Sequence, residues 1–284
     1  MKQTVLITGA NGFVAKYLAP KLQQHYNVKL LTRTPNAPNE YRWDLENFTI
    51  DENALDGIDY IVHLAGAKFS DGTTPLTEDL KKLILDTRIG AANFLREKLK
   101  ARNQKIKSFI SASAIGYYGF TDTTLEIDEN GNKGIDFGAE VCDEWEKAAN
   151  RFKAEEVAEF VCKIRVPVVL GKGEGAFPGF ENLVKTNPEA VEQPNPNALP
   201  WGHIKDVAGI FKFAVENNLD GVYNSVAPNA ASMQDVLKAI ANNIGNTNHQ
   251  IQPFNGKHLV SHKIIKAGYT FQYPDIENAV ADIL

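Results

Sequence analysis

The stretch "TVLITGANGFVA" (residues 4–15) decides the fold class of this chain. Its first part is a short β-branched run that ends at Gly9, as buried strands of parallel sheets do. From Phe13 onward the apolar residues follow the spacing of an amphipathic helix. A strand, a glycine-rich turn and a helix in this order indicate the start of an α/β fold that binds a nucleotide.

The glycines of this turn have separate purposes. Gly9 lets the chain turn sharply. Gly12 lets a pyrophosphate approach the helix N-terminus, where free N–H groups and the helix dipole favour anions. Ala15 stands where a third glycine often permits close helix–strand packing. The spacing G-x-x-G-x-x-A differs from the usual G-x-G-x-x-G, so the prediction rests on its place at the start of an α/β alternation. The predicted cofactor contacts of the turn are Gly9, Asn11, Gly12, Phe13 and Val14.

Strands and helices alternate along the rest of the chain. Apolar runs predict strands at 28–33, 60–66, 106–113, 160–171 and 220–226, and periodic apolar faces predict helices over 77–101, 139–153 and 204–217. This alternation predicts a doubly wound parallel sheet, a Rossmann domain, with ligands at the carboxyl ends of the strands. We expect this domain over 1–226, with the proline-rich residues 172–201 as a loop over the active site. A small, mostly helical substrate or lid lobe is expected over 227–284.

Composition narrows the class of partner. The chain has 284 residues, with 30 Lys and Arg against 35 Asp and Glu, a formal charge of −5. That balance lacks the positive field that nucleic-acid binding needs. The first apolar run is too short for a signal-peptide core, and no later run would span a bilayer. We therefore expect a cytoplasmic protein with a small-molecule substrate, no nucleic-acid or membrane partner, and leave a homodimer open.

The end of the second predicted strand bears on the choice of cofactor. An acidic residue at this point would hold the ribose diol of NAD. The chain instead has Thr32, Arg33 and Thr34. A guanidinium and hydroxyl groups would bind a 2′-phosphate, and a charge-assisted hydrogen bond contributes about 1.5–3 kcal/mol. We therefore predict NADP(H) in preference to NAD(H), with Thr32 and Arg33 in contact with it.

Seven further motifs follow in order along the chain: "WDL" (43–45), "HLAGA" (63–67), "SASAIGYYG" (111–119), "CDEWEKAA" (142–149), "RVPVVLG" (165–171), "PWGHIKD" (200–206) and "FQYPDIENAVADIL" (271–284). Together with the glycine turn, they resemble the atypical short-chain dehydrogenases/reductases of the NAD(P)-dependent epimerase/dehydratase type. More narrowly, they resemble a branch with a short C-terminal extension. The resemblance covers nearly the whole chain, and the order and spacing of the pieces carry it.

The resemblance implies which residues contact each part of the cofactor. The implied contacts are Asp44 and Leu45 at the adenine, Leu64, Ala65 and Gly66 along the middle, Arg88 at the phosphates, and Ala112 and Val169 at the nicotinamide. His203 and Asp206 resemble a helix start with structural contacts rather than a proton shuttle.

Most relatives in this resemblance pass a proton through a tyrosine, assisted by a lysine four residues later. This chain has Phe137 and Val141 at those positions, and neither side chain can transfer a proton. Ser113, which in the family would hydrogen-bond the substrate oxygen, and Tyr117 and Tyr118 are the predicted catalytic residues. The alternatives, that the serine caps a strand end and the tyrosines pack the cleft wall, stay open.

No metal site is predicted. His258 and His262 have helical spacing, but "LVS" between them lacks the glutamate of a zinc-binding H-E-x-x-H motif.

Two functions compete at this stage. The first is an NADP(H)-dependent oxidoreductase that transfers a hydride to or from a small carbonyl or hydroxyl substrate. The second is a catalytically weak NADP(H)-binding redox sensor that acts through a protein partner.

Overall fold

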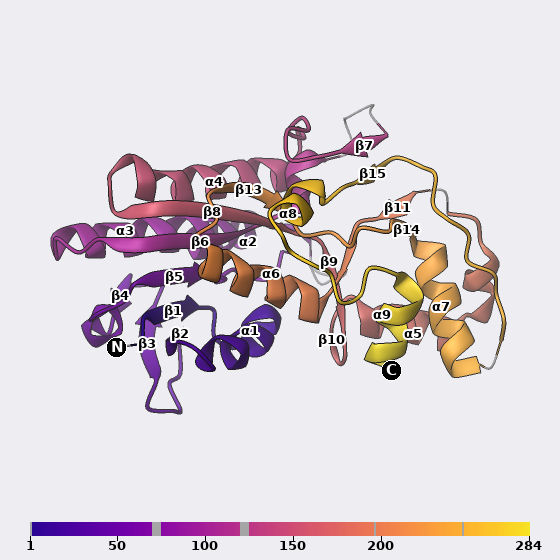
Figure 1. The fold of residues 1–284 in the computed structure, drawn as a ribbon, viewed down its shortest axis with the longest axis horizontal. Coiled ribbons are helices and arrows are strands. Elements are labelled where there is room, and N and C mark those ends of the chain that lie inside the picture. Colours follow the sequence, from indigo (N-terminus) through magenta and orange to yellow (C-terminus); the bar gives the residue numbers. More distant parts are fainter. Residues whose placement is uncertain (1, 70–74, 120–124, 196, 246) are drawn as a thin grey trace. The chain divides into compact units, whose positions relative to one another are not determined.

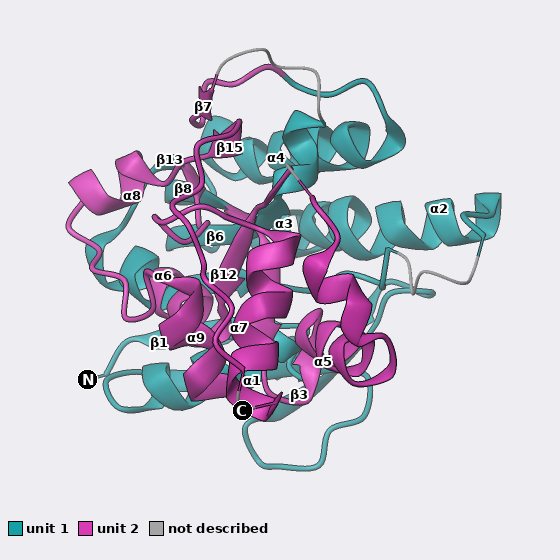
Figure 2. Ribbon diagram, turned by 90° about the vertical axis from the view of Figure 1, so that its right-hand side faces the viewer, with its two compact units in different colours: residues 1–119, 133–164, 211–222 teal, residues 120–132, 165–210, 223–284 magenta. Residues whose placement is uncertain are grey.

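The computed structural model describes residues 2–69, 75–119, 125–195, 197–245 and 247–284. The chain divides into two compact units, which are coloured separately in Figure 2. Unit 1 comprises residues 1–119, 133–164 and 211–222, and unit 2 comprises residues 120–132, 165–210 and 223–284. This division groups residues 165–210 with the C-terminal segment, whereas the boundary expected from the sequence falls at 226.

Unit 1 is built on an eight-stranded sheet with the order β13-β8-β6-β5-β1-β2-β3-β4 (Figure 1). The final residues of β8 and β13 belong to unit 2. Strands β6, β5, β1, β2 and β3 pair in parallel, and β4 pairs antiparallel to β3. The strands are β1 (Thr4–Thr8), β2 (Asn27–Thr32), β3 (Glu40–Asp44), β4 (Thr49–Ile50), β5 (Tyr60–His63), β6 (Ile106–Ala114), β8 (Ala158–Val166) and β13 (Gly221–Asn224).

The sheet runs outward from β1 in two directions, to β2 on one side and to β5 on the other. The predicted doubly wound α/β fold is therefore confirmed. In such a sheet, a ligand lies at the carboxyl ends of the strands where the winding direction changes, here between β1 and β5.

Helices cover both faces of this sheet (Figure 1), with α1 packed on β1 and β2 and with α4 packed on β6. Side-chain caps fix where two of them begin: Thr77 Oγ1 accepts the Leu80 N–H at 3.3 Å, and Asp136 Oδ1 accepts the Ala139 N–H at 2.9 Å. The helices are α1 (Phe13–Gln23), α2 (Glu78–Leu85), α3 (Ala91–Ala101), α4 (Phe137–Ala154) and the end of α6 (Ile204–Asn217).

The helix predicted over 77–101 is interrupted at Asp86–Gly90, where one π-helical turn joins α2 to α3. Single turns of this kind inside α-helices are frequent at functional sites. Arg88 lies in this turn.

The core of unit 1 fills the space between the sheet and the helices. Phe109 on β6 and Phe152 on α4 are fully buried and stack with ring centroids 3.7 Å apart. Val141, Trp145, Ala148 and Ala149 face inward from α4, as predicted. Each such buried side chain contributes about 1.5–3 kcal/mol when it is large and apolar, so this packing holds α4 firmly against β6.

Unit 2 has its own core, to which buried side chains of α5, α7 and α9 contribute. Figure 2 labels these three helices. Its helices are α5 (Phe177–Thr186), α7 (Met233–Gly245), α8 (His262–Lys266), α9 (Ile276–Ile283) and the start of α6. Its short strands are β7 (Glu126–Ile127), β9 (Val168–Gly171), β10 (Glu174–Gly175), β11 (Ala198–Leu199), β12 (Trp201–His203), β14 (Ala231–Ser232) and β15 (His258–Leu259).

Two expectations for unit 2 are wrong. Residues 177–186, expected to be loop, form α5, because Pro178 stands in the first turn where its missing N–H costs nothing and Phe177 and Val184 are buried. His258 and His262 do not share a helix, since His258 lies in β15. No helix among the described residues combines the length and apolarity needed to cross a bilayer.

Candidate functional site

The turn after β1 is shaped by its glycines. Gly9 has a φ of +68°, and a Cβ there would lie 3.0 Å from the Ala65 Cα, so only glycine fits. The Gly12 N–H donates to the Gly9 carbonyl at 2.8 Å, which closes the turn. Gly12 caps α1 without a side-chain bond, and the first turn of α1 has no acidic residue. Gly12 thus supplies no side-chain acceptor to the first N–H groups of α1, and N–H groups at a helix start favour an anion.

A buried network links the ends of β1 and β5 to the π-helical turn. Thr8 Oγ1 accepts the N–H groups of Leu64 and Ala65, both at 3.0 Å, and lies 2.9 Å from His63 Nδ1. The threonine hydrogen is thus left for Nδ1, so Nε2 carries the imidazole proton and donates to the Arg88 carbonyl at 3.0 Å. Burial lowers the pKa of His63 from 6.5 to about 4, and the ring is neutral at neutral pH.

The same network holds the backbone of Arg88, whose side chain has its own surroundings. Its guanidinium lies 5.1 Å from the ring centre of Trp145, and a Cβ on Gly66 would come within 2.9 Å of its Cζ. Burial lowers the pKa of this guanidinium. Within the described part of the chain, its one hydrogen bond runs from Nη1 to the Ile84 carbonyl at 3.4 Å, and it has no ion pair. A largely buried cation without an anion is costly, so this arrangement calls for an anionic ligand.

The end of β2 bears the predicted cofactor-selecting residues. Thr32 is buried, and its Oγ1 accepts from Asn11 Nδ2 at 3.1 Å, which ties the glycine turn to β2. Arg33 is exposed just beyond the strand. Arg42 on β3 pairs in register with Thr32, so a second exposed cation stands at the same edge of the sheet. Sequence reasoning missed Arg42 because β3 itself was not predicted.

The adenine-side residues lie at the end of β3. Asp44 Oδ1 accepts the Glu46 N–H at 2.9 Å, and Asp44 Oδ2 accepts from Asn47 Nδ2 at 2.8 Å. The hydrogen bond from the Asn47 side chain holds the pKa of Asp44 below its usual value. Leu45 packs against the core of unit 1. The Asp44 carboxylate thus shapes its own turn.

The carboxyl end of β6 holds a buried polar pair. Ser113 Oγ donates to Glu146 Oε1 on α4 at 2.8 Å, and the two side chains are 2% and 7% exposed. Ala112 precedes the serine on the strand and is also buried. Glu146 was not predicted, although the sequence carries a signal: it lies four residues after buried Cys142 and three before buried Ala149, on the apolar stripe of α4.

The other two predicted catalytic residues follow the same strand. Tyr117 and Tyr118 form the 3₁₀ turn after β6, with Tyr118 buried and the two rings edge to face, 5.6 Å apart. Phe137 begins α4 and lies 5.7 Å from the ring centre of Phe69, while Val141 is buried. The structure therefore places apolar packing where the resemblance implies a tyrosine and a lysine.

In unit 2, Asp206 has the structural role that the resemblance implies. It stands in the first turn of α6 and accepts from the Tyr269 hydroxyl, the Gln272 N–H and the Tyr273 N–H at 2.8–2.9 Å. His203 is buried, and burial lowers its pKa to about 4. Val169, predicted at the nicotinamide, lies in β9 of this unit.

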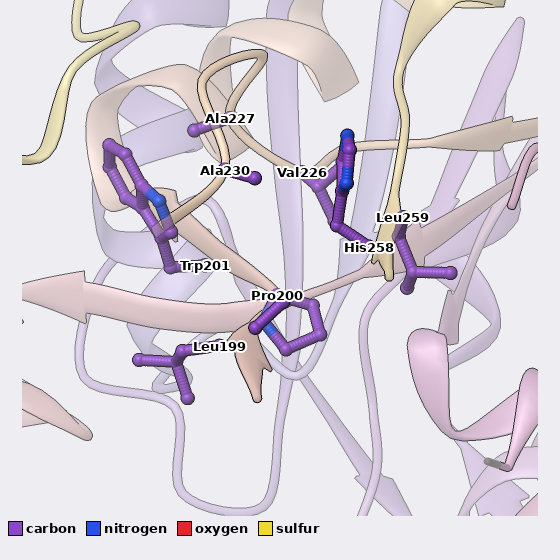
Figure 3. A pocket seen from close by; sticks show the side chains of 9 residues that line it. Leu199, Pro200, Trp201, Val226, Ala227, Ala230, His258 and Leu259 are labelled. Carbon is purple, nitrogen blue, oxygen red and sulfur yellow. The ribbon is translucent and has the colours of Figure 1, made fainter. Parts of the chain in front are cut away.

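Unit 2 also contains a small pocket (Figure 3). It is mostly apolar and contains none of the predicted site residues; its lining is Ala198, Leu199, Pro200, Trp201, Val226, Ala227, Ala230, His258 and Leu259. Among the described residues, no three His, Cys, Asp or Glu side chains gather in a way that could hold a metal ion.

The doubly wound sheet and its glycine turn define the class of Rossmann-type nucleotide-binding proteins. The model of the NAD dependent epimerase/dehydratase family matches residues 5–134. The epimerase family protein SDR39U1 homolog, chloroplastic, of Arabidopsis thaliana is 30% identical over 253 residues, which cover 84% of this chain and 70% of that protein. The chain belongs to the NAD dependent epimerase/dehydratase family.

Solved structures of the family resemble it closely. The nucleoside-diphosphate sugar epimerase from Corynebacterium glutamicum has a TM-score of 0.80 and 29% identity over 100% of this chain, which spans only 58% of that longer chain. The human epimerase family protein SDR39U1, whose crystal structure was determined with NADPH, has a TM-score of 0.77 and 24% identity, with 99% of each chain covered.

Proposed function

We propose that this chain is an NADP(H)-dependent oxidoreductase of the epimerase/dehydratase family that acts on a hydroxyl or carbonyl group of a small molecule. The single observation that carries the proposal is the Arg88 guanidinium, largely buried at the strand ends and without an ion pair among the described residues. The phosphates of a dinucleotide would supply its missing anion. The NADPH in the human SDR39U1 structure supports the same cofactor.

The residues present fit such a cofactor. The turn of Gly9 and Gly12 leads into α1, whose N-cap makes no side-chain hydrogen bond, and a pyrophosphate would bind at this helix start. Arg33 and Arg42 stand at the end of β2 and on β3, where an acidic residue selective for NAD is absent from the described strand end. These two cations would hold a 2′-phosphate. When bound, the nicotinamide supplies a hydride acceptor or donor.

The reacting end would be the carboxyl end of β6, because a dinucleotide crosses the sheet from the β1–β2 side to the β5–β6 side. Ser113 Oγ would contact the substrate oxygen there, and because its own hydrogen goes to Glu146, it would accept the hydrogen of a substrate hydroxyl. Trp145, buried beside Arg88, would help to exclude water from the site. Tyr117 remains a candidate proton donor on the turn that follows β6.

Epimerisation of a nucleotide sugar is less well supported. It would need cations for a second diphosphate, and residues 172–201 contain only Lys172 and Lys185. Lys172 Nζ donates to the Leu284 carbonyl at 3.2 Å, and Lys185 pairs with Glu181 at 2.5 Å. Both cations are therefore engaged within unit 2.

The proposal is tested by calorimetric titration of the protein with NADPH and NADH. We expect NADPH to bind about tenfold more tightly or better, since a charge-assisted contact to the 2′-phosphate contributes about 1.5–3 kcal/mol. Arg33→Ala and Arg42→Ala should each reduce that preference without weakening NADH binding.

Exposed Arg151 on α4 offers a matched control, because Arg151→Ala removes the same charge away from the strand ends. It should leave both affinities unchanged. If neither nucleotide binds the wild-type protein, the proposal is overturned. If both bind but no aldehyde, ketone, quinone or alcohol of a test panel changes the cofactor's oxidation state, the sensor function becomes the better account.

A further inference from the structure

The pair of Ser113 and Glu146 raises a question that cofactor binding alone leaves open, namely why a carboxylate is buried at the end of β6. Glu146 is 7% exposed, and Ser113 Oγ donates to its Oε1 at 2.8 Å. A buried carboxylate is costly unless hydrogen bonds or an opposite charge offset the loss of water. The alternation of α4 would accept an apolar residue here, since Cys142 and Ala149 on either side are buried.

We propose that Glu146 is a fixed negative charge at the reacting end of the cofactor site, and that it makes the site select oxidised over reduced cofactor. The inference rests on the proposed function. The nicotinamide ring carries a positive charge when oxidised and none when reduced, and the rest of the nucleotide is the same in both forms. A nearby carboxylate therefore stabilises the oxidised form alone.

The fold places Glu146 for this role. Ser113 is the last residue but one of β6, which lies next to β5 in the sheet. This is the side of the switch point that receives the nicotinamide half of a dinucleotide. Ser113 is a positioning residue here, because its hydroxyl fixes the carboxylate oxygen and thereby the direction of the charge. Arg88 lies against Trp145, the neighbour of Glu146, but it would neutralise phosphates that both cofactor forms carry. Its effect cancels when the two forms are compared.

The inference also specifies a class of reaction. A site that stabilises the oxidised cofactor shifts the equilibrium between the two bound cofactor forms toward NADP⁺. It therefore favours hydride transfer from NADPH to the substrate, so the substrate class is a carbonyl compound rather than a secondary alcohol. At this end of the site the Glu146 carboxylate supplies the negative charge, and it accepts from the Ser113 hydroxyl. Phe137 and Val141 supply neither charge nor proton in its place.

The test measures the Kd of NADP⁺ and of NADPH for each variant by calorimetry at neutral pH, and compares their ratio. Wild type should bind NADP⁺ more tightly than NADPH. Glu146→Gln keeps the size and one hydrogen-bond acceptor of the side chain but removes the charge. It should shift the ratio toward NADPH by about tenfold, the lower end of what a neighbouring opposite charge does to an ionisation equilibrium.

A matched control lies one turn earlier on the same helix. Asp143 pairs with Lys133 and Lys147 at the surface of α4, and Asp143→Asn removes the same charge there. It should leave the ratio within about twofold of wild type. Ser113→Ala retains the Glu146 charge and should change the ratio less than Glu146→Gln does.

The outcomes separate the two proposals. An unchanged NADPH affinity in Glu146→Gln, together with an unchanged circular dichroism spectrum, would show that the site is intact and that the ratio reports the charge. An equal affinity of wild type for both forms, or a ratio that Glu146→Gln leaves unaltered, overturns this inference while the cofactor assignment stands. Failure of wild type to bind either nucleotide overturns the proposed function, and this inference with it.

Discussion

Two strand ends of unit 1 make the parts of the candidate site in different ways. After β1 the site is made of backbone groups: Gly9 and Gly12 form the turn, and α1 begins without a side-chain cap from Gly12. After β6 the site is made of side chains: the hydroxyl of Ser113 donates to the carboxylate of Glu146, which lies on another element, α4. The first part is local in the chain, whereas the second joins residues that are 33 positions apart.

This difference decides how each part should respond to change. A backbone-built site depends on φ values and on close approach, so any added side chain damages it. A side-chain-built site depends on charge and hydrogen bonds. A replacement of the same shape that removes the charge should therefore still alter it. His63 lies between the two, since its ring joins Thr8 at the end of β1 to the π-helical turn that holds Arg88.

The largest effect is expected from acid, through His63. Its pKa is about 4 in the folded protein and near 6.5 when unfolded, so the unfolded chain binds the extra proton first as pH falls. The stability that the neutral ring contributes is complete above pH 6.5 and is lost toward pH 4. The loss is about 2 kcal/mol by pH 5 and about 3 kcal/mol over the whole range. Urea unfolding at pH 7 and pH 5 measures it.

His63→Gln should reduce that acid-dependent loss, because glutamine has no proton to gain. His203, whose pKa is also about 4, should account for most of what remains. His262→Gln at an exposed position is the matched control and should retain the full loss. The same acid sensitivity in His63→Gln as in wild type would contradict the buried network.

A smaller effect is expected at the backbone-built end. Gly9→Ala must hold an alanine at φ +68° with its Cβ 3.0 Å from the backbone of Ala65, so we expect about 2 kcal/mol of lost stability. NADPH binding should weaken as well, because the turn has to move. Gly57 is the matched control, because it has a similar φ of +62° but nothing within 4 Å of the added Cβ.

Gly57→Ala should therefore cost only the left-handed backbone term, about 1 kcal/mol, and leave NADPH affinity unchanged. Thermal or urea unfolding and calorimetry on the two variants separate strain from site damage. Equal effects of the two alanines would show that the contact with Ala65 is unimportant.

The smallest effect is expected from a substitution of Arg88. Arg88→Gln should weaken NADPH and NADH alike by about tenfold, because their shared phosphates lose a charge-assisted partner. Arg102→Gln, which removes the same charge from a surface pair with Glu52 and Asp56, should leave both affinities unchanged. A change in the NADPH preference, rather than in both affinities, would place Arg88 near the 2′-phosphate instead.

The backbone-built end was predictable from the sequence because a glycine in such a turn indicates the backbone conformation directly. The "TVLITG" run and its turn therefore gave β1, α1 and the fold class. Strand β3 was missed since only Trp43 of its five residues is buried, so no apolar pattern marks it. The same omission hid Arg42 from the cofactor prediction.

The side-chain-built end was not predictable to the same extent. Ser113 was identified by resemblance, but its partner was not, because a single glutamate on a helix shows no long-range contact by itself. Only the packing of α4 on β6 brings Glu146 to Ser113. The pocket of unit 2 and helix α5 were not predicted either, because the prolines of residues 172–201 indicated only a loop.

The π-helical turn at Asp86–Gly90 has a consequence for insertions and deletions. A π turn holds about one residue more than an α turn, so the two helices that it joins are out of phase by one position. Deleting one residue within 86–90 would restore an unbroken α-helix and rotate everything on one side of it by about 100° relative to the other. The Arg88 carbonyl, which accepts from His63 Nε2 at 3.0 Å, would then move relative to the imidazole. In this segment, the number of residues matters as much as their identity.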